Sequence, residues 1–177
     1  MGAVDPLAVG MACALLATLF AHAALTKAAD LPLLEQHLAA YGLPFSALAA
    51  TARALAGAEA LVALLLLSPW RALGAAGALA LLLVYAAAMA WHRLRGHELD
   101  CGCGSEPLSV SWVLVARNLG LAGLAGLAMA PTRPRAMVMA DFAVIAGAVV
   151  LGCLLYAALH QVLRHAGRGR ARTFGRT

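Results

Sequence analysis

Residues 72–91 read ALGAAGALALLLVYAAAMAW and contain no charged side chain. A helix that crosses the hydrocarbon core of a bilayer needs about 20 consecutive apolar residues, and this stretch has that length. The rest of the chain agrees, since 63% of its 177 residues are hydrophobic and only 12% are charged. The mean hydropathy is +0.85. This composition excludes a soluble globular protein of this size.

Four further stretches are long and apolar enough to span a membrane. They cover residues 7–26, 47–67, 108–130 and 142–159. The apolar runs are continuous rather than alternating, and backbone hydrogen bonds inside a bilayer must close within the protein, so helices are favoured over strands. The sequence therefore predicts an all-α, multi-pass protein with five spans in a cell membrane, either the inner or the plasma membrane.

The segments outside the spans divide the chain further. Leucines and a tyrosine recur every three or four residues between 30 and 43, which predicts a short amphipathic helix that lies on the membrane surface or simply connects two spans. Five arginines follow residue 163, and they predict a disordered basic tail over 164–177 near anionic headgroups rather than a nucleic-acid site. We expect a helical domain over 7–130 and an additional helix over 137–163.

Polar side chains in the predicted spans gather in one half of the membrane. Charged groups are costly in a bilayer, so each one marks a candidate site. Because the spans alternate in direction, the polar residues fall in the half beside a polar loop at about 96–107. They are His22, Lys27, Arg53, Glu59, His92, Arg117 and Asn118. We predict a polar pocket at this end, supported by His22, Lys27, Glu59, Arg117 and Asn118, with an ion pair between Glu59 and Arg117.

The polar loop contains Cys101-Gly102-Cys103-Gly104. Two cysteines at positions i and i+2 can form a disulfide, but the short ring is strained, and strained disulfides are oxidising or exchange-prone. Gly102 eases the turn because glycine tolerates positive φ. Cys101 and Cys103 are therefore the candidate catalytic residues of a thiol–disulfide exchange site.

Two other interpretations of the loop stay open. His92, His97, Cys101 and Cys103 lie within twelve residues and offer the donors that zinc or copper(I) prefers, which fits a metal-delivery protein. A disulfide that only ties the loop fits a structural membrane subunit, although so short a ring closes little chain entropy. Cys13 and Cys153 lie alone in apolar runs, where thiols behave as small hydrophobes.

The orientation of the loop is ambiguous. With five spans, the face that holds the loop carries nine Lys and Arg residues against three on the other face, and short cytoplasmic loops are enriched in these residues. The charge count therefore places Cys101 and Cys103 in the cytoplasm. Disulfide chemistry favours the opposite side.

These residues also carry a resemblance to the methylamine utilisation protein MauE family, which is related to the DoxX-like membrane proteins. The resemblance covers about residues 7–130, and the motifs that carry it are Phe20-Ala-His-Ala-Ala-Leu-Thr-Lys27, Leu38–Pro44, the helix of Glu59, Cys101-Gly-Cys103-Gly104 and Arg117-Asn118. It implies a four-helix transmembrane bundle, to which this chain adds a fifth, C-terminal helix.

The resemblance also implies a function. It suggests maturation of an extracytoplasmic redox enzyme of the methylamine dehydrogenase type, through disulfide formation or isomerisation alongside a thioredoxin-like partner or client. It would place the dicysteine loop outside the cytoplasm. A quinone bound in the polar pocket is a further hypothesis, motivated by the apolar half of the bundle below it.

Overall fold

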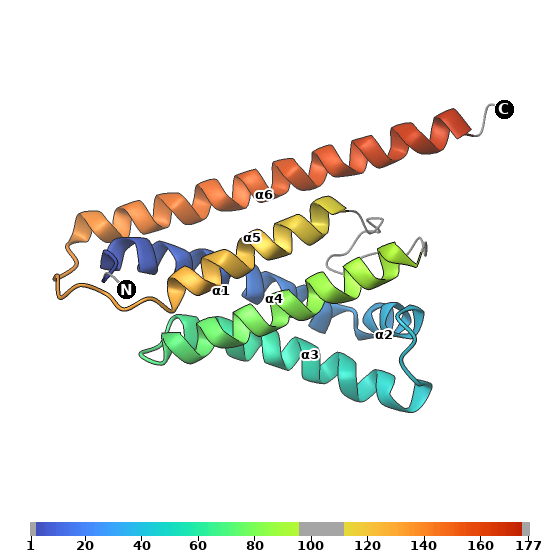
Figure 1. Cartoon of the computed structure of the whole chain (residues 1–177), viewed down its shortest axis with the longest axis horizontal. Coiled ribbons are helices and arrows are strands. Elements are labelled where there is room, and N and C mark those ends of the chain that lie inside the picture. The colour runs from blue at the N-terminus through green and yellow to red at the C-terminus, as the bar shows by residue number, and fades with distance from the viewer. Residues whose placement is uncertain (1–2, 96–111, 175–177) are drawn as a thin grey trace.

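The computed structural model describes residues 3–95 and 112–174, and within them the chain folds into six helices (Figure 1). These are α1 (Pro6–Ala29), α2 (Leu31–Ala40), α3 (Phe45–Leu66), α4 (Arg71–Leu94), α5 (Trp112–Ala128) and α6 (Met139–Phe174). Helices α1, α3 and α4 and the segment Met139–Ala158 of α6 are long and apolar enough to cross a membrane, and α5 is a shorter apolar helix. The predicted all-α, multi-pass membrane architecture is confirmed.

Helices α1, α3, α4 and α5 form the bundle. Helix α1 packs against α3 and α5, and α4 packs against the same two helices from the other side. The short helix α2, which matches the amphipathic helix predicted over 30–43, packs mainly on α3. Helix α6 lies along α1 (Figure 1). The predicted four-helix bundle with one additional C-terminal helix is therefore present.

Local signals set the helix ends. Asp5 precedes Pro6 and its side chain accepts a hydrogen bond from the Leu7 amide at 2.8 Å, which is a typical N-cap. Asp30 caps α2 in the same way through the Leu33 amide at 3.0 Å. Gly42 follows α2 with a φ of +87°, a conformation that glycine adopts without steric cost. These caps and turns begin and end helices that the apolar pattern alone defines only loosely.

Small residues let the helices of the bundle approach closely. The buried core contains many alanines, and Leu16 and Phe20 of α1 and Leu82 of α4 fill the space between them. A Cβ added at Gly74 in α4 would lie 2.6 Å from the backbone nitrogen of Leu66 in α3. Lipid tails are as apolar as the helices, so the hydrophobic effect does not drive helices together in a bilayer. Close packing through small residues is therefore the usual means of helix association there.

The start of the chain closes one end of the bundle. The Val4 amide donates to the Pro131 carbonyl, and the Arg133 amide donates to the Val4 carbonyl, both at 2.9 Å. These bonds place Val4 beside Thr132 in an isolated bridge. Residues before α1 and after α5 are thereby fastened to each other.

The C-terminal helix is longer than the sequence suggested. We expected a disordered tail from residue 164, but α6 continues to Phe174. The tail contains alanine and arginine, which favour helices, and contains no proline to end one. The basic tail is therefore a continuation of α6 as far as Phe174.

Candidate functional site

Two of the predicted pocket residues, Lys27 of α1 and Glu59 of α3, form a buried ion pair. The Lys27 ammonium, in the last turn of α1, contacts both carboxylate oxygens of Glu59 in α3 at 2.6 and 2.8 Å. Lys27 is 8% exposed and Glu59 is 1% exposed. Lys27 also lies near the C-terminus of α1, where the helix dipole favours a cation. Two oppositely charged residues from different helices therefore neutralise each other inside the bundle.

Tyr85 of α4 completes this cluster. Its hydroxyl donates to Oε1 of Glu59 at 2.6 Å, and its ring centroid lies 5.5 Å from the Lys27 ammonium. Sequence reasoning missed Tyr85, although its hydroxyl is a polar group in the middle of the uncharged run 72–91 and could have signalled a buried partner. The Lys27–Glu59–Tyr85 cluster joins α1, α3 and α4.

The other predicted supporting residues lie outside this cluster. Asn118 is 2% exposed and its amide nitrogen donates to the Leu114 carbonyl one turn back in α5, at 3.1 Å. His22 is exposed on the surface of α1. The ion pair that we expected between Glu59 and Arg117 is wrong, because Glu59 pairs with Lys27. The guanidinium of Arg117 lies instead 5.8 Å from the ring of Tyr156 in α6.

The candidate metal ligands are placed only in part. His92, at the end of α4, meets the ring of Tyr41 edge-on with centroids 4.5 Å apart. His97, Cys101 and Cys103 lie outside the described residues. Among the residues that the structure describes, no three His, Cys, Asp or Glu side chains form a group that could hold a metal ion. Cys13 is buried and Cys153 is exposed, and neither forms a disulfide.

The dicysteine motif lies outside the described residues, but the helices before and after it along the chain are described. Helix α4 ends at Leu94 and α5 begins at Trp112, so both attachment points of the loop lie at the end of the bundle where α1 ends and α3 begins (Figure 1). Of the Lys27–Glu59–Tyr85 cluster, Lys27 lies in the last turn of α1, at this end, and Tyr85 lies nine residues before the end of α4. The opposite end is where α3 turns into α4.

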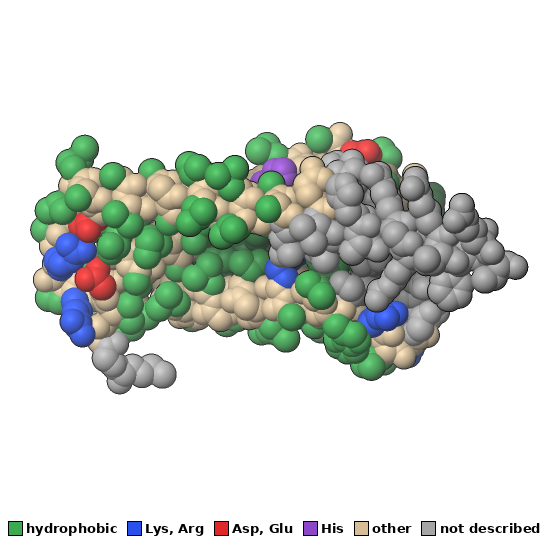
Figure 2. Space-filling model, turned by 90° about the horizontal axis from the view of Figure 1, so that it is seen from above, with side chains coloured by type: hydrophobic (Ala, Val, Ile, Leu, Met, Phe, Trp, Pro, Cys, Tyr) green, Lys and Arg blue, Asp and Glu red, His purple; other side chains and the backbone are tan. Residues whose placement is uncertain are grey.

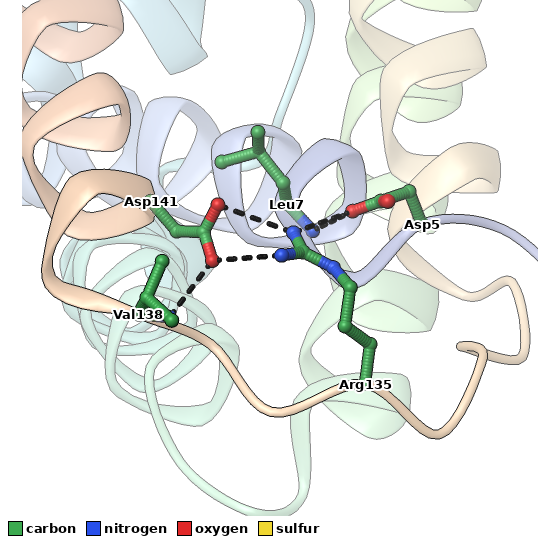
Figure 3. Close-up of polar contacts among 5 residues, drawn as sticks. All are labelled: Asp5, Leu7, Arg135, Val138 and Asp141. Carbon is green, nitrogen blue, oxygen red and sulfur yellow. Dashed lines mark hydrogen bonds and ion pairs between the residues drawn. The ribbon is translucent and has the colours of Figure 1, made fainter.

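A second ionic cluster fastens that opposite end (Figure 3). The Arg135 guanidinium lies between Asp5, before α1, and Asp141, in the first turn of α6, with nitrogen–oxygen distances of 3.1 Å to both. Hydrogen bonds from the Leu7 amide and from Arg135 lower the pKa of Asp5. The carboxylates of Asp141 and Asp5 raise the pKa of Arg135. This cluster links the start of α1 to the start of α6 and is structural in character.

Comparison with known proteins places this architecture in a family. The sequence profile described as methylamine utilisation protein MauE matches residues 5–131. Methylamine utilization protein MauE of Paracoccus denitrificans is 49% identical over 83 residues, which make up 45% of this chain and 44% of that protein. The match thus spans less than half the length of this relative. No solved structure matches the chain. Since the profile covers α1 to α5 and most of the chain, the protein belongs to the methylamine utilisation protein MauE family.

Proposed function

We propose that this membrane protein serves methylamine utilisation as a thiol–disulfide redox protein that assists maturation of an extracytoplasmic redox enzyme. The observation that carries the proposal is the buried Lys27–Glu59–Tyr85 cluster, whose Lys27 lies in the last turn of α1, at the end of the bundle where α4 ends and α5 begins. Buried ion pairs in membrane helices are rare and mark functional sites by default. Membership of the MauE family supports the pathway.

The proposed exchange uses the two loop cysteines in turn. A thiolate of Cys101 or Cys103 attacks one sulfur of a disulfide in a thioredoxin-like partner or client, and the second partner sulfur leaves as a thiolate. The other loop cysteine then attacks the mixed disulfide and releases the first partner sulfur. The partner disulfide is reduced to a dithiol and the loop dithiol is oxidised to a disulfide, so electrons balance, and the reverse sequence oxidises a client.

In this proposal the buried cluster takes no part in the thiol chemistry and instead holds the helices of the bundle in place. Lys27, Glu59 and Tyr85 join α1, α3 and α4, and Asn118 is buried in α5, the helix that follows the dicysteine motif along the chain. A neutral, fully hydrogen-bonded pair can remain in a low-dielectric interior where a lone charge cannot. These residues are therefore positioning residues, and the cysteines carry the chemistry.

The first test is labelling of intact cells with a membrane-impermeant maleimide. The variant to use carries Cys13→Ser and Cys153→Ser, so that only the loop thiols can react. Labelling that appears only after reduction supports an oxidised, extracytoplasmic loop. Labelling that requires lysis places the loop in the cytoplasm and overturns the proposal.

Activity and metal content provide the second test. Cys101→Ser and Cys103→Ser should each abolish maturation of the redox enzyme in a complementation assay, whereas Cys153→Ser should support it fully. Full complementation by the double variant of Cys101 and Cys103 contradicts the redox proposal. Stoichiometric zinc or copper that is lost in the same double variant would instead identify a metal-delivery protein.

A further inference from the structure

Helices α5 and α6 border a furrow on one face of the molecule. Both helices pack on α1, but the described residues include no close backbone approach between α5 and α6 themselves. Seen from the α6 side, the face is hollowed between two rows of helix, with hydrophobic side chains inside it and a Lys or Arg side chain near one end (Figure 2). Helix α6 contains a stretch that is long and apolar enough to cross a membrane, and α5 is a shorter apolar helix, so a furrow between them would face lipid in a bilayer.

Arg117 of α5 places a basic side chain near α6. It is the only Lys or Arg in α5, and its guanidinium lies 5.8 Å from the ring of Tyr156 in α6. Its Nε is buried and has no hydrogen-bond partner among the described residues. No carboxylate in the described part of the chain forms an ion pair with it. A cation–π contact supplies far less than a counter-charge in a desolvated site, so the guanidinium has unused capacity for an anion.

The depth of Arg117 fits the level of lipid headgroups. Arg117 lies five residues after the start of α5 at Trp112, which is roughly 7–8 Å along the helix axis at the usual rise per residue. Tryptophan favours the membrane interface, and an arginine side chain can extend from that depth to the interface. The arginine therefore lies near the membrane interface, and the apolar furrow lies deeper in the membrane. A phospholipid has its phosphate and its acyl chain in the same order.

We propose that Arg117 binds the phosphate of an anionic phospholipid whose acyl chain lies in the furrow between α5 and α6. The site is separate from the cysteine chemistry and does not depend on the proposed function. The planar guanidinium can donate two parallel hydrogen bonds to phosphate oxygens. A water-soluble anion would gain the same charge contact but nothing from the apolar furrow.

Native mass spectrometry of the purified protein in detergent tests this site directly. The probes are dioleoylphosphatidylglycerol and dioleoylphosphatidylcholine, which share their acyl chains and differ in net charge. The wild type should bind one phosphatidylglycerol at least tenfold more tightly than phosphatidylcholine, a difference of about 1.4 kcal/mol. Arg117→Gln should remove this preference. The control Arg53→Gln changes an exposed arginine of α3 and should retain it.

A lysine variant and a competition with inorganic phosphate complete the test. If Arg117→Gln does not fold, Arg117→Lys, which keeps the charge but loses the bidentate geometry, should weaken phosphatidylglycerol binding severalfold while Arg53→Lys does not. Inorganic phosphate should fail to displace the lipid at millimolar concentration. Equal binding of both lipids, loss of preference in Arg53→Gln, or displacement by free phosphate would each overturn the proposal.

Discussion

Replacing Lys27 with methionine removes the cation that pairs with Glu59 while keeping a long side chain in the same space. Glu59 is 1% exposed and, among the residues that the structure describes, would retain only the hydrogen bond from Tyr85. Removing one partner of a buried ion pair costs about 3–5 kcal/mol, because the remaining charge is left uncompensated. For a chain of this length that corresponds to a fall in melting temperature of roughly 6–20 °C.

A double variant separates the net contribution of the pair from the cost of breaking it. Lys27→Met combined with Glu59→Gln removes both charges and keeps an acceptor for the Tyr85 hydroxyl. Replacement of both members of a buried pair is often neutral, so we expect the free energy of unfolding to return to within about 1 kcal/mol of the wild type. The assay is reversible denaturation in mixed detergent micelles, followed by circular dichroism.

The matched control is Arg53→Gln, an exposed change in the helix that carries Glu59, which should shift the free energy of unfolding by less than about 0.5 kcal/mol. A loss below about 1 kcal/mol in Lys27→Met would refute the reasoning. So would a double variant whose loss equals the sum of the single losses. In either case Lys27 and Glu59 would not be an energetically coupled buried pair.

Three further predictions concern the packing and the second ionic cluster. Leu16→Ala, at a position with 0% exposure, should lower the free energy of unfolding by about 2–5 kcal/mol in the same denaturation assay; a loss below about 1 kcal/mol would show that the site is not tightly packed. Gly74→Ala should destabilise by about 1–3 kcal/mol because its Cβ would meet the backbone of α3, whereas Gly123→Ala meets nothing within 4 Å and should be neutral or stabilising by up to about 1 kcal/mol. The pKa of Asp5 is lowered, so its contribution to stability is present above the ordinary pKa of about 4 and is lost as the pH falls below it; melting temperatures measured against pH should show this loss in the wild type and a smaller one in Arg135→Gln.

The helices could be predicted from the sequence because their signals are local. An apolar run of about 20 residues in lipid forms a helix because its backbone groups must hydrogen-bond within the segment. The stretch 72–91 lies within α4 as expected. The short helix α2 could be predicted from the spacing of its leucines. The end of α6 was not, since alanine and arginine with scattered glycines suit a helix and a flexible tail alike.

The contacts between helices were harder to predict because they depend on how each helix is rotated. Lys27, Glu59 and Arg117 were all expected in the half of the membrane beside the dicysteine loop. Lys27 lies in the last turn of α1 and Arg117 lies near the start of α5, whereas Glu59 lies past the midpoint of α3. Which cation meets Glu59 is decided by a rotation of α5 that turns Arg117 toward Tyr156. Spacing along one helix carries no information about that rotation when apolar residues surround the helix on all sides.

The bridge between Val4 and Thr132 has a consequence for chain connectivity. The region that matches the family begins at residue 5 and finishes at residue 131, so its two ends meet at one point in space. A short linker could join them, and the turn at Ser68, at the same end of the bundle, could be opened to provide new termini. Such a circular permutant would keep the direction of every helix across the membrane, and exposed turns tolerate cutting of this kind. The same packing of helices is therefore compatible with more than one order of the helices along the chain.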